Sequence, residues 1–334
     1  MESYTPKNIW LITDGKPGHE TQLIGLGERL QELSGATIHW HHIKSKRLKK
    51  GHPSTEFQQA APQEADPQND ALKKTENTTS SPDLLIAAGH RTHRTLYFLA
   101  RKHKAFSTVL MKPSLPLGFF NAIICPSHDK LKPSERVLNT DGVINKVRPS
   151  RDAKVPKQHS ILLGGPSKHF EWSDNALFKQ IETLVSARPD AQWEVYASPR
   201  TPAIFSAMLS ASSLPNLTFR PYTTQAKHSL QAALKSSSEC WITPDSVSMI
   251  YESLTAGCAT ATFTSPVSKT KKLGRVALGL QQLIDAQRIS QWQPSQLARP
   301  LPANTSTLWE ADRATHWLLE RFKKHEIDHR QERK

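Results

Sequence analysis

Residues 240–263, CWITPDSVSMIYESLTAGCATATF, contain the pattern that decides the fold. Cys240–Thr243 is a short apolar run, and Ala259–Phe263 is a second one. Between them, Ser246–Ala256 has helical spacing, and Gly257 ends that helix. Two buried strands joined by one helix lie parallel, because such a crossover returns the chain to the same edge of the sheet. The stretch therefore predicts a parallel α/β sheet.

The same alternation of strand, loop and helix runs through the rest of the chain. In the first half, strands are predicted at Asn8–Thr13, Thr37–Ile43, Leu84–Ala88, Thr108–Met111 and Ala122–Cys125, with helices near 20–33 and 91–104. In the second half, further strands are predicted at Ser160–Leu163, Trp193–Ala197 and Leu217–Arg220, with helices near 175–186, 202–209 and 225–234. The fold class is therefore α/β, with two similar sheets.

A length of 334 residues favours two domains, and a basic, proline-containing joint at 148–157 separates the two halves. We expect an N-terminal domain at 1–150, a second domain at 151–305, and a C-terminal helix at 306–334 that packs back on the first domain. Residues 51–82 lack periodicity and are rich in proline and polar residues, so we expect a disordered insert there. Two such domains imply a cleft between them.

The charge balance favours anionic partners. Lys and Arg number 44 and Asp and Glu number 30, which gives a net charge of +14. The densest basic run, at 44–50, suits either a solvated loop or contact with an anionic membrane. No aromatic residues are interleaved with it, so nucleic acid is not the expected partner.

Several classes of protein are excluded. No apolar run approaches the roughly 20 residues that a membrane span needs. Three separated cysteines are typical of a reducing cytosol rather than of a disulfide framework. There is no G-x-x-x-x-G-K-[ST] loop, no G-x-G-x-x-G motif and no D-x-D motif, and Cys125 and His128 form an isolated C-x-x-H. We therefore expect neither a bound metal nor a dinucleotide cofactor.

The helix after Asp245 is a candidate phosphate site. The free N–H groups of its first turn attract an anion, and the hydroxyls of Ser246 and Ser248 add donors. Glu252 lies six residues after Ser246, about 9 Å along the helix axis, where a carboxylate reaches the ribose hydroxyls of a nucleotide. An ordinary capped helix explains the same pattern, and Asp245 repels a phosphate unless it caps the helix.

Two further loops follow predicted strands. Gly164 and Gly165 permit close approach of the backbone, while Ser167 and Lys168 offer a hydroxyl and a cation to a phosphate, although a plain turn has the same composition. In the first half, Asp14 and His19 share the first strand–helix loop. Histidine is the natural general base near neutral pH, but among 15 histidines any single one is more often structural.

These loops resemble a known family. The stretch 14–20, DGKPGHE, resembles the opening signature of the elongated-mitochondria (plant mitochondrial fission factor) family, whose bacterial branch is assigned to glycosyltransferases. Blocks at 88–92, 126–129, 164–168 and 245–252 match later family blocks in order. The resemblance implies the GT-B architecture of two Rossmann-like domains, and departs from the family at the insert.

The resemblance also implies a function. Gly164, Gly165, Ser167, Lys168, Ser246 and Ser248 would hold the diphosphate of a nucleotide sugar, and Glu252 its ribose. His19, oriented by Asp14, would deprotonate an acceptor hydroxyl on a cell-envelope glycolipid such as lipopolysaccharide core. The protein would act in the cytoplasm, in peripheral contact with the inner face of an anionic membrane. A nucleotide-sugar epimerase and a non-catalytic fission-factor-like scaffold are the alternatives.

Overall fold

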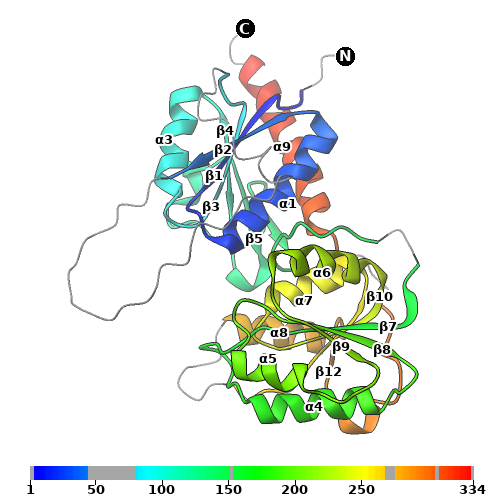
Figure 1. Cartoon of the computed structure of the whole chain (residues 1–334). Helices are drawn as coiled ribbons and strands as arrows, with labels where there is room; N and C mark the ends of the chain where they lie inside the picture. The colour runs from blue at the N-terminus through cyan, green and yellow to red at the C-terminus, as the bar shows by residue number, and fades with distance from the viewer. Residues whose placement is uncertain (1–3, 44–79, 151–152, 268–274, 305–307, 332–334) are drawn as a thin grey trace, which may run out of the picture. The chain divides into compact units, whose positions relative to one another are not determined.

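The computed structural model describes residues 4–43, 80–150, 153–267, 275–304 and 308–331 (Figure 1). The basic run at 44–50 and the insert predicted at 51–82, except its last three residues, lie outside the described residues. The chain separates into two compact units. Unit 1 comprises 1–140 and 311–334, and unit 2 comprises 141–310.

Unit 1 contains a six-stranded parallel sheet in the order β2-β1-β3-β4-β5-β6. Its strands are β1 (Asn8–Thr13), β2 (Thr37–His42), β3 (Leu84–Ala88), β4 (Phe106–Leu110), β5 (Ala122–Pro126) and β6 (Val137–Thr140). Its helices are α1 (Pro17–Ser34), α3 (His93–His103) and α9 (Glu310–Gln331), with single turns η1 (Leu117–Phe119) and η2 (Ser127–Asp129).

The direction of each crossover decides which face a helix covers in unit 1. The chain moves from β1 to one side through α1, and from β3 to the other side through α3. Because such crossovers are right-handed, α1 and α3 cover opposite faces, as Figure 1 shows. Helix α9 lies beside α1, where Asp312 accepts a hydrogen bond from Arg29 Nε at 2.8 Å, and Phe322 packs against Phe106 of β4.

Unit 2 contains a second six-stranded parallel sheet in the order β12-β11-β10-β7-β8-β9. Its strands are β7 (Val155–Leu162), β8 (Gln192–Tyr196), β9 (Leu217–Arg220), β10 (Ser237–Ile242), β11 (Ala259–Thr262) and β12 (Ser290–Gln291). Its helices are α4 (Asp174–Ser186), α5 (Ala203–Ser210), α6 (Thr224–Ser236), α7 (Val247–Ala256) and α8 (Arg275–Asp285), with a turn at η3 (Pro294–Gln296).

Both faces of this second sheet are buried. Along β10, Cys240 and Ile242 belong to the apolar cluster under α6, α7 and α8, while Trp241 belongs to the cluster under α4 and α5. Figure 1 shows these two groups of helices on opposite faces of the sheet. Burial on both faces explains why Cys240, Trp241 and Ile242 follow one another as an apolar run at the end of β10. The predicted α/β fold with two Rossmann-like units is confirmed.

Candidate functional site

The centre of unit 2 lies at β7, where the strand order reverses. The chain leaves β7 toward β8 and β9 and later returns on the other side of β7 as β10. Ligands of parallel α/β sheets bind beyond the carboxyl ends of the strands at such a point. Here Gly164 N–H donates to Thr243 Oγ1 at 2.8 Å, and Gly165 N–H donates to Asp245 Oδ2 at 3.0 Å. The loops after β7 and β10 are thus joined by two hydrogen bonds.

The two glycines leave room for protein atoms. A Cβ on Gly164 would collide with the side chains of Asp245 and Ser246, and a Cβ on Gly165 would collide with the backbone of Arg200. The sequence predicts that something packs closely against these glycines, and the structure shows that the neighbouring loops of unit 2 do so. Their N–H groups are also occupied, so they are not free to bind a phosphate.

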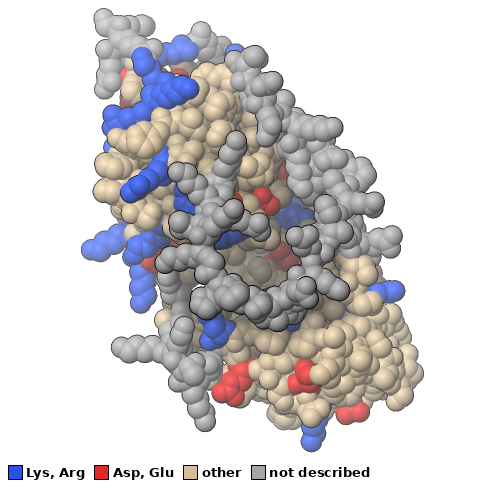
Figure 2. Space-filling model, turned by 60° about the vertical axis from the view of Figure 1, so that its left-hand side comes forward, with Lys and Arg blue, Asp and Glu red and all other residues tan. Residues whose placement is uncertain are grey.

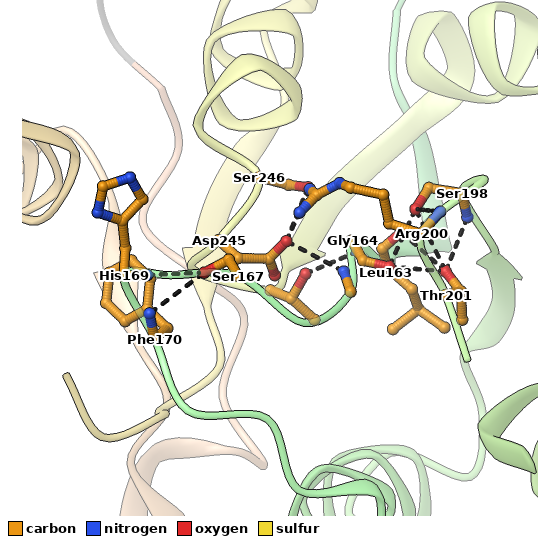
Figure 3. Close-up of polar contacts among 12 residues, drawn as sticks. Leu163, Gly164, Ser167, His169, Phe170, Ser198, Arg200, Thr201, Asp245 and Ser246 are labelled. Carbon is orange, nitrogen blue, oxygen red and sulfur yellow. Dashed lines mark hydrogen bonds and ion pairs between the residues drawn. The ribbon is translucent and has the colours of Figure 1, made fainter. Parts of the chain in front are cut away.

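Arg200 is a site residue that no motif in the sequence indicates. Its Nη2 lies 2.7 Å from Asp245 Oδ2 and donates to Ser246 Oγ at 2.9 Å (Figure 3). The loop that carries it follows β8 and is fixed by Ser198 and Thr201, whose hydroxyls donate to the carbonyl of Gly164 at 2.9 and 2.7 Å. The Asp245 side chain is 2% exposed and the Arg200 side chain 47% exposed, so the guanidinium covers a buried carboxylate.

The start of α7 presents unused donors. Within the described part of the chain, no protein group accepts from the N–H groups of Val247, Ser248 and Met249. Asp245 does not cap the helix, since its carboxylate accepts from Gly165 and Arg200 instead. The Asp245 side chain is therefore not turned back over the first turn of α7 as a helix cap.

The remaining predicted residues of unit 2 surround this centre. Ser167 Oγ accepts from the N–H groups of His169 and Phe170, each at 3.2 Å, so it stabilises its own turn. Lys168 and Ser248 are exposed, and Glu252 is half-buried on α7. Gly164, Gly165 and Ser246 are thus brought into direct contact with Asp245 and Arg200.

A cavity of about 180 Å³ opens beside Asp245 within unit 2. Apolar side chains of Phe170, Trp172 and Phe263 contribute to its walls, together with Gln180 of α4. Asp245 also lines the cavity, and its Oδ1 is a buried acceptor with no hydrogen-bond partner among the described residues. The cavity therefore has aromatic walls and lies next to a buried carboxylate.

Unit 1 has its own reversal of strand order between β1 and β3. His19 Nδ1 lies 2.7 Å from Asp14 Oδ1, and Lys16 Nζ lies 3.5 Å from Asp14 Oδ2. Gly89, after β3, has φ of +94°, and a Cβ there would collide with the His19 ring. Burial alone would raise the pKa of Asp14, but the hydrogen bond and charge of His19, with Lys16, hold that pKa below its ordinary value. Asp14 is therefore an ionised partner for His19.

A second histidine is buried next to this pair. Burial, with the neighbouring charges of His90 and His19, lowers the pKa of His93 to about 4. Ser114 N–H donates to His93 Nδ1 at 3.1 Å, while Nε2 is buried without a partner among the described residues. His93 is thus a neutral imidazole that supports the loop rather than a second base.

The comparisons with known proteins agree with this architecture. The family model described as Mitochondrial fission ELM1 matches residues 17–322. The chain belongs to the mitochondrial fission ELM1 family. An uncharacterized relative, RP120 of Rickettsia prowazekii (strain Madrid E), is 22% identical over 262 residues, which cover 60% of this chain and 67% of that protein. The family that the sequence motifs indicate is therefore confirmed.

Two solved structures share the fold over nearly the whole chain. The glycotransferase of kitacinnamycin has a TM-score of 0.50 at 12% identity and covers 96% of this chain and 94% of its own. A protein from Listeria monocytogenes that is assigned as a UDP-N-acetylglucosamine 2-epimerase has a TM-score of 0.52 at 9% identity and covers 95% of this chain and 97% of its own. The fold is thus GT-B, which transferases and epimerases share.

Two general features complete the description. Among the described residues, no three His, Cys, Asp or Glu side chains are grouped so that they would hold a metal ion. None of the described helices has the length and apolarity that crossing a bilayer requires.

Proposed function

We propose that this protein is a glycosyltransferase that takes its sugar from a nucleotide-diphosphate donor bound by unit 2. The observation that carries the proposal is the start of α7, where three unused N–H groups lie next to the guanidinium of Arg200. A helix N-terminus and a fixed cation together stabilise the negative charge of a diphosphate. Lys168, which is exposed on the loop after β7, supplies a second cation.

Other groups of unit 2 suit the rest of the donor. Glu252 lies on α7 beyond the phosphate-binding turn, where we propose that its carboxylate accepts hydrogen bonds from the ribose. The cavity beside Asp245 has the aromatic walls that a flat base packs against. Ser246 and Ser248 lie at the start of α7 and contribute hydroxyl donors, while Gly164, Gly165 and Ser167 shape the neighbouring loop without donating to the ligand.

In unit 1 we propose that His19 acts as the general base. We propose that the ionised Asp14 accepts from His19 Nδ1–H, at the observed separation of 2.7 Å, and so directs the lone pair of Nε2 to the acceptor hydroxyl. Nε2 takes the proton of the acceptor hydroxyl, whose oxygen then bonds to the anomeric carbon of the sugar. The bond from that carbon to the diphosphate breaks, and the nucleoside diphosphate leaves with the electron pair. The helix start and Arg200 stabilise the charge that develops on it.

We further propose that the acceptor is a cell-envelope glycolipid, met by peripheral contact with the inner face of the cytoplasmic membrane. The support is the net charge of +14, because a basic protein is attracted to an anionic lipid surface. Lipopolysaccharide core is an acceptor of this kind.

The decisive assay follows sugar transfer from a panel of nucleotide sugars to glycolipid extracts. We expect His19→Ala to lower the rate at least a hundredfold, in the range typical of a general base. His316→Ala is the matched control, because His316 is an exposed residue of α9 at 61% exposure. Transfer at the wild-type rate by His19→Ala would refute the catalytic assignment.

Two alternatives give different outcomes in the same experiment. The fold is shared with a UDP-N-acetylglucosamine 2-epimerase, and an epimerase would convert the donor without any acceptor. A fission-factor-like scaffold, which the family description favours, would neither bind nor consume a nucleotide sugar. Incubating the protein with donor alone therefore separates an epimerase from a transferase, and measuring nucleotide-sugar binding separates both enzymes from a scaffold.

A further inference from the structure

Unit 1 contains a large cavity at the edge of its sheet opposite to Asp14 and His19. The cavity measures about 840 Å³ and is lined from the starts of β4 and β5, the end of α3 and the last turns of α9. Asp14 and His19 follow the carboxyl end of β1, whereas these lining segments lie at the amino ends of strands. This basic chamber is therefore separate from the proposed catalytic site. Its size lies within the range of sites for small organic ligands.

Four cationic side chains line the basic chamber: Arg101, Lys104, Arg136 and Arg330. Arg101 is held in place by Tyr97, whose ring centroid lies 5.0 Å from the guanidinium carbon. In the described part of the chain, neither Arg101, Lys104 nor Arg136 forms an ion pair with a carboxylate. Uncompensated like charges around one cavity repel one another, and an anion between them removes that repulsion.

Two carboxylates, those of Asp83 and Glu326, also line the basic chamber. Asp83 Oδ2 accepts from the backbone N–H groups of Lys7 and Asn8, at 2.7 and 2.9 Å, and so anchors the start of β1. Glu326 Oε1 lies 3.8 Å from His325 Nδ1. The four cationic side chains outnumber these two carboxylates, so the charge of the lining stays positive.

Three histidines complete the lining with groups that donate hydrogen bonds. His325 Nε2 and His329 Nε2 lie 3.1 Å apart, and His103 Nδ1 lies 3.1 Å from Ser81 Oγ. Arginine guanidinium groups bind phosphate oxygens well, because they form bidentate, charge-assisted hydrogen bonds. Figure 2 shows Lys and Arg side chains gathered over unit 1, in the upper part of the view.

We propose that the basic chamber of unit 1 is a second ligand site, which binds the phosphate of a phosphorylated organic molecule. A phosphate monoester carries close to two negative charges at neutral pH and three acceptor oxygens, which matches the surplus of donors. Both a lipid headgroup and a free metabolite carry this group. Exposed Phe98 and Phe119, at 67% and 43% exposure, lie beside the chamber on α3 and η1, where a bilayer would meet them.

Two probes of the full-length protein test the proposal. Isothermal titration with glycerol phosphate measures the free phosphate ester, and co-sedimentation with phosphatidylcholine vesicles containing phosphatidic acid measures the same group on a lipid. We expect the double variant Arg101→Gln/Arg136→Gln to lose affinity at least about tenfold, since each arginine contributes a charge-assisted hydrogen bond. Both side chains are exposed, so the variant keeps its fold.

Arg94→Gln is the matched control, because Arg94 lies on the same helix, is exposed and does not line the chamber. If the double variant loses binding of glycerol phosphate but not of vesicles, the ligand is a free phosphate ester. If it loses binding of vesicles but not of glycerol phosphate, the ligand is a lipid. Absence of binding to both probes, or an equal loss in Arg94→Gln, overturns the proposal. Competition by UDP would also overturn it, since UDP belongs to the site of unit 2.

Discussion

The carboxylate of Asp245 is almost completely buried, yet it lies next to the turn that is proposed to hold a diphosphate. A buried carboxylate is costly unless it is paired and hydrogen-bonded. Arg200 and Gly165 N–H satisfy Oδ2, while Oδ1 is buried without a partner among the described residues. Arg200 therefore has two roles, because it neutralises Asp245 and presents positive charge at the start of α7.

Removing Arg200 should destabilise unit 2 more than removing a similar exposed arginine. Arg200→Gln leaves the buried Asp245 carboxylate without its cation, with only the Gly165 N–H and the distant Ser246 hydroxyl as donors, and we expect a loss of about 1–3 kcal/mol in the free energy of unfolding. Arg220→Gln is the control, because Arg220 is equally exposed but pairs at 2.8 Å with the more exposed Glu194. That loss should stay below about 1 kcal/mol. Urea denaturation measures both, and equal losses would argue against the role given to the buried carboxylate.

The buried imidazole of His93 makes stability depend on pH. Its pKa in the folded protein is about 4, below the ordinary 6.5, so the unfolded chain binds the proton more readily. Stability should therefore fall as the pH falls from 6.5 to 4, by about 3 kcal/mol more in the wild type than in His93→Gln. Denaturation curves recorded between pH 6.5 and pH 4 test this pH dependence. His316→Gln is the control, and its stability should follow that of the wild type. Parallel curves for wild type and His93→Gln would contradict it.

At the scale of helices and strands, periodicity predicted the elements that are buried on both faces. Leu84–Ala88 begins and ends where the sequence indicates, because a fully buried apolar run between polar loops leaves little ambiguity. Leu217–Arg220 also has the predicted bounds, although its exposure alternates along the strand. Strands β6 and β12 were not predicted, since VLNT and a two-residue strand carry almost no pattern. The last helix was predicted within 306–334, and it spans Glu310–Gln331.

The candidate site was predictable only in part from the sequence. Gly164, Ser246 and the pair Asp14 and His19 follow strand ends, and strand ends can be read from apolar runs. Arg200 follows a strand too, but its ion pair joins residues 45 positions apart and depends on the order of strands in the sheet. The basic chamber was not predicted either, because it combines the ends of α3 and α9, which are more than 200 residues apart in the chain.

Helix α9 should be essential to unit 1, since it returns from the far end of the chain to cover the first sheet. Leu318 is fully buried, so Leu318→Ala should cost about 2–5 kcal/mol of the free energy of unfolding. Phe98→Ala removes a larger side chain that is 67% exposed and should cost less than about 1 kcal/mol. Guanidinium denaturation compares the two, and a small loss for Leu318→Ala would show that α9 contributes little to the packing of unit 1.

At the scale of the whole molecule, the two units have different proposed tasks. Unit 2 offers helix N–H groups, a cation and an aromatic cavity, which together suit a nucleotide diphosphate. Unit 1 offers an oriented imidazole at one edge of its sheet and the basic chamber at the other. Donor binding and proton transfer are thus assigned to separate sheets, so variants in one unit should leave the other task intact.

Isothermal titration of the full-length protein with a panel of nucleotide sugars tests this division most directly. We predict that at least one of them binds the wild type, that Glu252→Ala weakens this binding at least about tenfold by removing the ribose contact, and that Asp14→Asn binds as the wild type does. Failure of every nucleotide sugar to bind, or wild-type affinity in Glu252→Ala, would contradict the account.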